Sequence, residues 1–432
     1  MNDLDRAEEV LEQLAGGGGD AEVYLKEGRG RRFSLSPEGE LCHFVQEQGW
    51  AVRAGDGRCS FFVAASGPPR PRGPWPEPDG YPLRLPDAVE PAPWREPAEV
   101  ESPLLGEREG VALLAAIAEA LARELPGARL RGALLEDGSS VSTLASTQGV
   151  RARWRQRLAA LRLLARRGDS PVEVSLERAE REARRFHPGA LASALADRLA
   201  AVDAGAPPPR DRGDMVLAPP VVARLLAHLA PLWLGPEAAE RAAALGERTR
   251  LAAAAVTLVD DGRLPEGLLS APVDGEGVPT REVVLIEAGG FRQPLVAWWQ
   301  RGAWQSSGCA ARPSWRDLPL PGPTHLYLRP DPAVRAGALL AAISRGYYLL
   351  DTRGPGWCDL RTGRFALPVC GFAIRDGRAQ APLGAAWLVG GVAALLRGIQ
   401  AVARDLAFSS LGGMIGAPTV VATGLEVRRA PG

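Results

Sequence analysis

The segment "ARLRGALLEDGSSVSTLASTQGVRARWRQRLAALRLLARRGD", residues 128–169, decides the fold class of the N-terminal half. It predicts a β-hairpin that belongs to an antiparallel sheet. The second arm, residues 151–167, is basic, and its apolar residues are spaced as on an element that buries one face and solvates its arginines. These apolar residues are Trp154, Leu158, Leu161, Leu163 and Leu164. A nucleic-acid contact is the alternative, but charge runs are more often solvated faces.

The segments around this hairpin extend the prediction. Residues 21–66 alternate with period two and predict strands joined by turns at Pro37–Gly39 and Asp56–Gly57. A short N-terminal helix stopped by Gly16–Gly19 and two longer helices over 105–127 and 187–205 complete this half. Residues 68–98 contain eleven prolines without periodicity, which predicts a surface loop or connector.

The stretch "APPPRDRGD", residues 206–214, is the clearest linker in the sequence. It predicts an N-terminal α+β domain over 1–205 and a C-terminal strand-rich domain over 215–432. The second domain begins with a strand and a helix over 221–235, continues mainly as strands, and has a late helix over 390–408. The predicted class is α+β, with an N-terminal antiparallel sheet with helices and a strand-rich C-terminal domain with a few helices.

Composition excludes several classes of protein. The chain has 432 residues with 51 basic and 51 acidic side chains, and this balance argues against a protein that mainly grips nucleic acid. Five cysteines without regular spacing indicate reduced thiols. The N-terminus has no apolar signal segment, and the most apolar stretch, 381–399, is too short and interrupted to span a membrane. We expect a cytoplasmic protein without membrane attachment.

Several segments, taken in order, resemble the TldD/PmbA family, named as modulators of DNA gyrase and later as peptidase components. The resemblance covers most of the chain, and its strongest segment ends in a D-G-E-G-x-x-T block. The segments are "DAEVYL" (20–25), "GWAVRAGDGRCSFFVAAS" (49–66), "GDMVLAPPVVARLLAHL" (213–229), "DDGRLPEGLLSAPVDGEGVPTREVVLIEAGGF" (260–291) and "GYYLLDTRGPGWCDLRTGRFALPVCGFAIRDGRAQAPL" (346–383).

The resemblance also implies what this chain lacks. Catalytic TldD-type subunits carry H-E-x-x-x-H on the helix after the "VLxP" strand and a late cysteine, which together hold zinc and activate water. The corresponding residues here are Ala227, His228 and Leu232. The late cysteine would fall within 409–416, and no cysteine follows Cys370. The chain therefore resembles the PmbA type, also called TldE. We expect no catalytic residue, metal or cofactor on this chain, with zinc on a TldD-like partner.

Residue chemistry alone points the same way for His228. The four histidines of the chain offer no pair at i, i+4 spacing. A lone histidine in an apolar helix is more often a hydrogen-bonded core or interface residue than a ligand.

Two further groups are candidates for contacts with a peptide or a partner subunit. Asp274 and Glu276 are two residues apart, but the glycines beside them favour a tight turn. Trp298 and Trp299 lie in a tryptophan-rich region that suits either an exposed patch or a buried sheet face.

These observations predict a non-catalytic, TldE/PmbA-like subunit of a heteromeric zinc metallopeptidase. It would bind short or unfolded peptides for trimming, including precursors of peptide natural products, as a heterodimer with a TldD-like chain. The alternative from another class is a regulatory or scaffold binding protein without peptidase activity. A free-standing hydrolase with unrecognised residues is the third interpretation.

Overall fold

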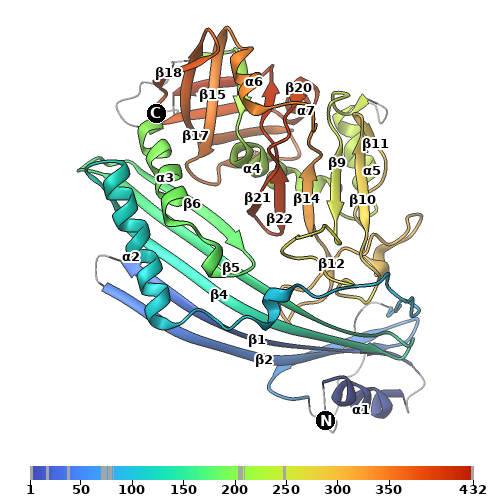
Figure 1. Ribbon diagram of the computed structural model, residues 1–432. Coiled ribbons are helices and arrows are strands. Elements are labelled where there is room, and N and C mark those ends of the chain that lie inside the picture. Colours follow the sequence, from blue (N-terminus) through green and yellow to red (C-terminus); the bar gives the residue numbers. More distant parts are fainter. Residues whose placement is uncertain are drawn as a thin grey trace.

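The computed structural model describes residues 3–15, 19–36, 39–69, 75, 80, 82–202, 208, 210–246 and 250–429. The N-terminal half is built on one antiparallel sheet with strand order β3-β2-β1-β4-β5-β6 (Figure 1). The predicted hairpin is confirmed, because β4 pairs with β5 along almost its whole length. The strands are β1 (Asp20–Ser36), β2 (Gly39–Gly55), β3 (Ser60–Ser66), β4 (Ala128–Ser146), β5 (Arg151–Arg167) and β6 (Glu173–Glu180).

One face of this sheet carries two separate apolar clusters. Helix α1 (Asp3–Ala15) packs on Val23 and Leu25 of β1, near one end of the long strands. Helices α2 (Glu107–Glu124) and α3 (Pro188–Val202) cover Phe33 and its neighbours near the other end (Figure 1). Because side chains alternate along a strand, the opposite face of β1 presents the even-numbered residues toward the C-terminal half.

The basic run of β5 packs and pairs its side chains within the N-terminal half. Trp154, Leu161 and Leu163 are buried, but on both faces of β5 and not on one as predicted: Leu161 and Leu163 pack with the helices, and Trp154 packs on the opposite face. Arg157 is fully buried and paired with Asp137, while the outward Arg155 binds carboxylates from the segment before α2. Arg151, Arg155, Arg157 and Arg162 of this run are thus paired with acidic residues of the same chain, and the prediction that its arginines are solvated is wrong for Arg157.

Residues 70–74, 76–79 and 81 of the proline-rich segment lie outside the described residues, and its described residues include exposed and buried positions. Three of its described residues pack against the rest of the chain. Leu83 and Leu85 are buried, and the ring of Trp94 lies 5.7 Å from the guanidinium carbon of Arg263. The predicted turn residues 37–38 and 16–18 also lie outside the described residues.

The C-terminal half consists of strands wrapped around a central helix, α4 (Pro219–Leu229). One sheet has the path β20-β23-β8-β15-β17-β19-β24-β7, with β16 and β18 also paired to β17. Its strands are β7 (Arg210–Asp211), β8 (Asp214–Leu217), β15 (Arg345–Thr352), β16 (Trp357–Asp359), β17 (Arg364–Arg375), β18 (Arg378–Pro382), β19 (Ala386–Gly391), β20 (Ile399–Val402), β23 (Val420–Ala422) and β24 (Glu426–Arg429).

A second sheet of this half has the order β11-β10-β9-β14-β22-β21, and β12 pairs with β13 beside it. These strands are β9 (Leu258–Asp261), β10 (Glu282–Glu287), β11 (Gly290–Phe291), β12 (Ala310–Ala311), β13 (Leu320–Pro321), β14 (His325–Leu328), β21 (Ala407–Ser410) and β22 (Met414–Ala417). The remaining helices are α5 (Ala238–Leu245), α6 (Ala336–Ala341) and α7 (Val392–Gly398). The α+β class is confirmed.

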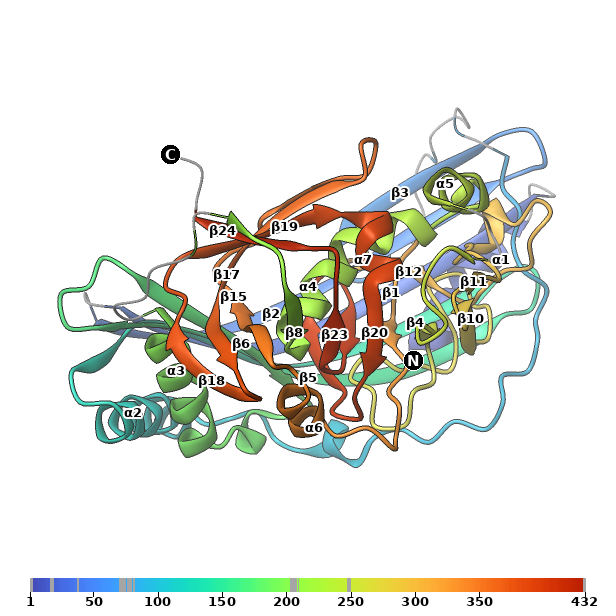
Figure 2. The ribbon, with the colours of Figure 1, turned by 90° about the horizontal axis from the view of Figure 1, so that it is seen from above.

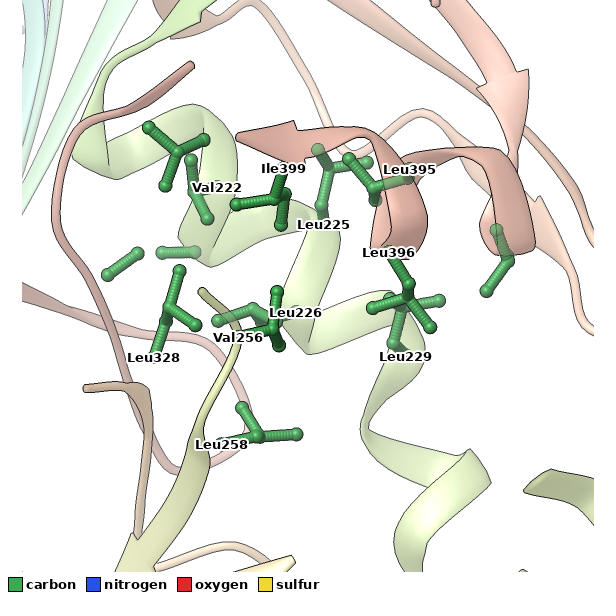
Figure 3. Packing of buried hydrophobic residues seen from close by; sticks show 14 of the residues in the cluster. Val222, Leu225, Leu226, Leu229, Val256, Leu258, Leu328, Leu395, Leu396 and Ile399 are labelled. Carbon is green, nitrogen blue, oxygen red and sulfur yellow. The ribbon is translucent and has the colours of Figure 1, made fainter. Parts of the chain in front are cut away.

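Helix α4 lies in the main hydrophobic core of this half. Leu225, Leu226 and Leu229 pack against Leu395 and Leu396 of α7 (Figure 3). The predicted helix over 221–235 ends early, at Leu229, and continues as a 3-10 helix over Ala230–Trp233. Pro231 explains this break, because a proline ring clashes with the carbonyl four residues earlier in an α-helix.

The predicted helix over 390–408 is wrong beyond its first turns. Helix α7 ends at Gly398, and β20 follows at once, paired with β23. A side chain at Gly398 would collide with the carbonyl of Thr423, so this close approach of two backbones suits glycine. The apolar residues of this segment are still buried in the same core, which is why their spacing resembled that of a helix.

The two halves meet at a mixed apolar joint. Tyr24, Leu144 and Trp154 from the sheet pack with Val273 and Trp315 from the C-terminal half. Farther along, α3 lies beside β17 and β18 (Figure 2), where Arg198 binds the carboxylate of Asp351. Residues 206, 207 and 209 of the predicted linker lie outside the described residues, and the division into domains 1–205 and 215–432 stays a prediction. Each helix in the described ranges is too short or too polar to cross a membrane.

Candidate functional site

A cavity of about 750 Å³ separates the N-terminal sheet from the loops of the C-terminal half. Its size falls in the usual range for ligand sites. Strands β1, β2, β4 and β5 supply the floor, including Tyr24, Gly28 and Ser140. Residues before β12, Arg312 after it and the β21–β22 turn supply the roof, including Gly275 and Gly413.

Asp274 organises the roof through backbone contacts. Its Oδ1 accepts hydrogen bonds from the amides of Glu276 (2.9 Å) and Val278 (3.0 Å), and its Oδ2 accepts one from Ala310 (2.9 Å). The predicted tight turn is present, with Gly277 at a φ of +85°. The carboxylate therefore closes this turn and fastens it to β12.

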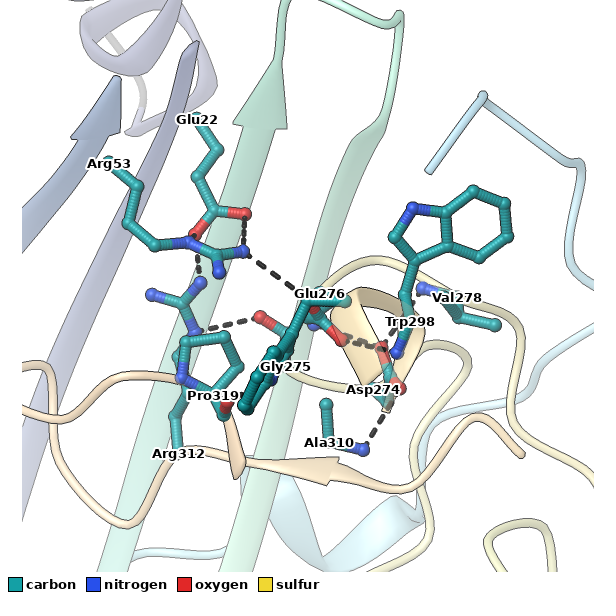
Figure 4. Close-up of polar contacts among 11 residues, drawn as sticks. Glu22, Arg53, Asp274, Gly275, Glu276, Val278, Trp298, Ala310, Arg312 and Pro319 are labelled. Atoms are coloured by element: carbon teal, nitrogen blue, oxygen red, sulfur yellow. Dashed lines mark hydrogen bonds and ion pairs between the residues drawn. The ribbon is translucent and has the colours of Figure 1, made fainter. Parts of the chain in front are cut away.

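Glu276 joins the turn to a buried ionic cluster that links the two halves (Figure 4). Its Oε2 accepts the amide hydrogen of Trp298 at 2.7 Å, and its Oε1 lies 3.5 Å from Nη2 of Arg53. Arg53 on β2 forms two 2.8 Å hydrogen bonds with Glu22, its register partner on β1. Arg312 also binds Glu22, and its Nε donates to the carbonyl of Gly275 at 2.7 Å.

The charges of this cluster do not balance when every group is ionised. Two guanidinium groups form ion pairs with Glu22 and Glu276, and the charge of Arg312 also acts on the third carboxyl group, that of Asp274. Burial alone would raise the pKa of Glu22, but Arg312 and Arg53 lower it to about 2. Burial raises the pKa of Glu276 to about 7 although Arg53 opposes this, and burial also raises that of Asp274. One proton on the turn would remove the excess negative charge.

The raised pKa of Glu276 predicts a pH-dependent stability. A carboxyl group whose pKa rises on folding contributes stability below its unfolded pKa and loses it as the pH rises through its folded pKa. The wild type should therefore lose up to about 3 kcal/mol relative to Glu276→Gln between about pH 4.5 and about pH 7. Urea unfolding of both proteins near both ends of this range measures the difference. A difference that does not change with pH would contradict the prediction.

The tryptophans do not form one exposed patch. Trp299 is 43% exposed and its Nε1 donates to the carbonyl of Pro319, whereas Trp298 is half-buried with Arg301 stacked on its ring. Trp315 is buried against Gly49, and Trp304 packs on Phe291. Peptide or partner contacts of Asp274, Glu276, Trp298 and Trp299 stay predictions. The carboxylates of Asp274 and Glu276 already accept hydrogen bonds from groups of this chain, and Trp299 is the most accessible of the four side chains.

The residues of this chain that correspond to the family's zinc motif cannot ligate a metal ion. Ala227 and Leu232 have no donor atoms, and Leu232 is buried in the core. His228 is half-buried and its Nε2 lies 2.6 Å from the carbonyl oxygen of Pro355. Within the described ranges, no three His, Cys, Asp or Glu side chains lie close enough to hold a metal ion. The β21–β22 hairpin, where the resemblance places a cysteine, packs against α4 and lines the cavity with Ser410 and Gly413.

Sequence reasoning missed the partners of Glu276 and the floor of the cavity. Glu22 and Arg53 lie on predicted strands, and a charged residue on an inward strand face requires a partner, but the sequence does not indicate which one. The floor glycines were not distinguished from turn glycines.

Comparisons with known proteins define the class. Residues 210–429 match the PmbA/TldA metallopeptidase C-terminal domain. A metalloprotease TldD homolog of Buchnera aphidicola subsp. Schizaphis graminum is 26% identical over 170 residues, which is 39% of this chain and 35% of that protein. The homolog of Haemophilus influenzae is 29% identical over 151 residues, 34% of this chain and 31% of that protein. These matches span about a third of the length of those relatives.

Solved structures share the whole fold. TldE from Thermococcus kodakarensis superposes with a TM-score of 0.83 at 16% identity, covering 97% of this chain and 100% of that one. A protein described as a modulator of a DNA gyrase from Thermotoga maritima gives 0.82 at 17% identity, covering 98% and 99%. The C-terminal half is thus of a metallopeptidase type. The chain belongs to the TldD/PmbA family, as its sequence predicted.

Proposed function

We propose that this chain is a non-catalytic, TldE/PmbA-like subunit of a heteromeric zinc metallopeptidase that trims short or unfolded peptides. The observation that carries the proposal is the chemistry of α4 and the turn after it. In a metallopeptidase-type domain, the motif positions hold Ala227 and Leu232, and His228 is bonded to a backbone carbonyl. A catalytic zinc site needs three protein ligands, so the metal would have to come from a partner, for which a TldD-like chain is the candidate.

The retained cavity supports a role in binding rather than only in scaffolding. The chain keeps a space of about 750 Å³ whose roof is fastened to the N-terminal sheet by the buried ion pairs Arg312–Glu22 and Arg53–Glu276. Such contacts fix a binding site in place without contributing chemistry to a reaction. The proposal places the complex in the cytoplasm, where the free thiols of the described residues would stay reduced.

Cleavage of a fluorogenic unfolded peptide should require both chains. This chain alone should be inactive, the mixture with a TldD-like subunit active, and a chelator should abolish the activity of the mixture. His228→Ala in this chain is the matched control and should change cleavage only a few-fold, because loss of a true base or ligand costs about a hundredfold or more.

Three results would contradict the proposal. Chelator-resistant cleavage by this chain alone would identify a free-standing hydrolase. One tightly bound zinc per chain would place the metal here. A failure of the two chains to associate or cleave together would favour the regulatory or scaffold protein.

A further inference from the structure

Strand β2 is only partly covered at the outer edge of the N-terminal sheet (Figure 1). Its residues 49–55 pair with β3, whereas residues 40–47 pair with β1 alone. Among the described residues, no other strand lies beside this part of β2. The main-chain groups along its outer side can therefore pair with a further strand, and we call residues 40–47 the free edge.

The free edge carries exposed apolar side chains on both faces of the sheet. Leu41 is 62% exposed, Phe44 is 59% exposed and Val45 is 37% exposed. Val45 lines the cavity and Leu41 shares its face, whereas Phe44 lies on the opposite face, because side chains alternate along a strand. By contrast, Trp50 and Val52, on the part of β2 that β3 covers, are buried.

The free edge lacks the usual protection of an edge strand. Natural edges often carry a lysine, a proline or a bulge that prevents another strand from pairing. Residues 40–47 contain neither proline nor lysine, and their register with β1 is continuous. The charged residues Glu40 and Glu47 lie at its two ends. An edge of this kind suits the addition of a strand.

The outward main-chain groups of the free edge belong to its even-numbered residues. The carbonyl of Gln48 accepts a hydrogen bond from the amide of Gly67, on the side of β3. In an antiparallel sheet, the N–H and C=O groups of every second residue point to the same side. The residues whose groups point away from β1 are therefore Gln46, Phe44, Cys42 and Glu40.

A second copy of the free edge fits this pattern when it runs antiparallel about a two-fold axis at His43. The outward groups of Phe44 then face those of Cys42 in the other copy, and those of Gln46 face those of Glu40. In the same register Leu41 lies beside Val45 of the other copy, so exposed apolar side chains cover each other. No two glutamates face each other.

The length of the free edge also fits a second copy. The paired segment ends at Glu47, because the carbonyl of the next residue, Gln48, is already bonded to Gly67. The loop that covers the sheet at this end packs Trp315 on Gly49. The two Gly49 residues would lie about 40 Å apart along the paired strands, so these loops of the two copies do not collide.

We propose that the free edge is a self-association surface, on which two copies of this chain join their N-terminal sheets through antiparallel β2 strands paired about His43. Such a pair uses the same patch on both copies, and two-fold dimers are the commonest oligomers of soluble proteins. A second copy is favoured over an unrelated strand because residues 40–47 satisfy both the main-chain groups and the apolar side chains of each other. The pairing goes beyond the proposed function and does not depend on it.

Single cysteines along the free edge of the full chain test the register. His43→Cys combined with Cys42→Ser should form an intermolecular disulfide on mild oxidation, because the Cα atoms of a facing, non-hydrogen-bonded pair lie about 4.5 Å apart. Native Cys42 should not, and neither should Phe44→Cys combined with Cys42→Ser, because each of these positions lies about 9 Å from its counterpart. Cys42→Ser alone is the matched control for the remaining cysteines.

Light scattering over a concentration series measures the association itself. The wild type should approach twice its mass of 45.7 kDa. Gln46→Pro should raise the dissociation constant at least tenfold, because the lost N–H points outward and is not used in the pairing with β1. Gln46→Ala is the matched control and should dimerise like the wild type. Both variants should keep the melting temperature of the wild-type monomer.

A wild type that stays monomeric throughout the series, a dimer that Gln46→Pro does not weaken, or a stronger cross-link at position 42 or 44 than at 43 would overturn the proposal. A cross-link from position 43 only to an added TldD-like chain would assign the edge to that subunit. Binding of a capped strand-forming peptide to a monomeric chain would make it a peptide site. Both results exclude the second copy. Dimerisation without peptide cleavage by the mixed subunits would remove the proposed function and leave this pairing in place.

Discussion

Replacing Glu22 by alanine is expected to lower the free energy of unfolding by about 3–5 kcal/mol, the usual cost of leaving a buried charge without its partner. Glu22 is 1% exposed and binds both Arg53 and Arg312. Alanine would remove the carboxylate that binds Arg312 and would leave Arg53 with its 3.5 Å contact to Glu276. Urea or thermal unfolding of the full chain measures the loss.

A surface pair provides the matched control. Glu8 and Arg151 form an ion pair with side chains 46% and 41% exposed, so Glu8→Ala should cost less than about 1 kcal/mol. If Glu22→Ala were no more destabilising than Glu8→Ala, the buried cluster would not hold the halves together. A partial recovery in Glu22→Gln is expected, because its amide oxygen can still accept one guanidinium hydrogen bond.

The second large effect is expected at Gly277, where two requirements for glycine coincide. Its φ is +85°, and a Cβ there would lie 2.6 Å from Cγ1 of Val150 and 3.1 Å from a methyl carbon of Leu144. Gly277→Ala should therefore cost the strain of a left-handed residue plus the overpacking of the joint, about 2–4 kcal/mol together.

Gly127 separates these two terms. Its φ is +84°, but a Cβ there would meet nothing within 4 Å. Gly127→Ala should therefore cost only the backbone strain, about 1–2 kcal/mol. Equal losses of unfolding free energy in the two variants would show that the contact of the turn with Val150 does not contribute.

The fold class could be predicted because its signal is local. Alternation along 128–167 specifies long strands whose partners are close in sequence, and the hairpin register follows from that. The prediction of a helix over 390–408 failed because the local spacing of apolar residues does not show that another backbone segment approaches Gly398 closely. That contact depends on Thr423, which belongs to a neighbouring segment of the folded protein.

The site was only partly predictable for the same reason. The glycines around Asp274 and Glu276 indicate a turn, but Arg53 contacts Glu276 across 223 positions of sequence. No single segment specifies such a pair.

The apolar joint between the halves also sets an order of events on the ribosome. The six paired strands of the N-terminal sheet are all synthesised once Glu180 has emerged, yet Val273 and Trp315, which cover Tyr24 and Trp154, follow about ninety or more residues later. At a synthesis rate of about 5–20 residues per second, the aromatic face of the nascent sheet stays uncovered for roughly 5–30 s. During that time a chaperone, or the same face of a neighbouring nascent chain, can bind where the roof will later close.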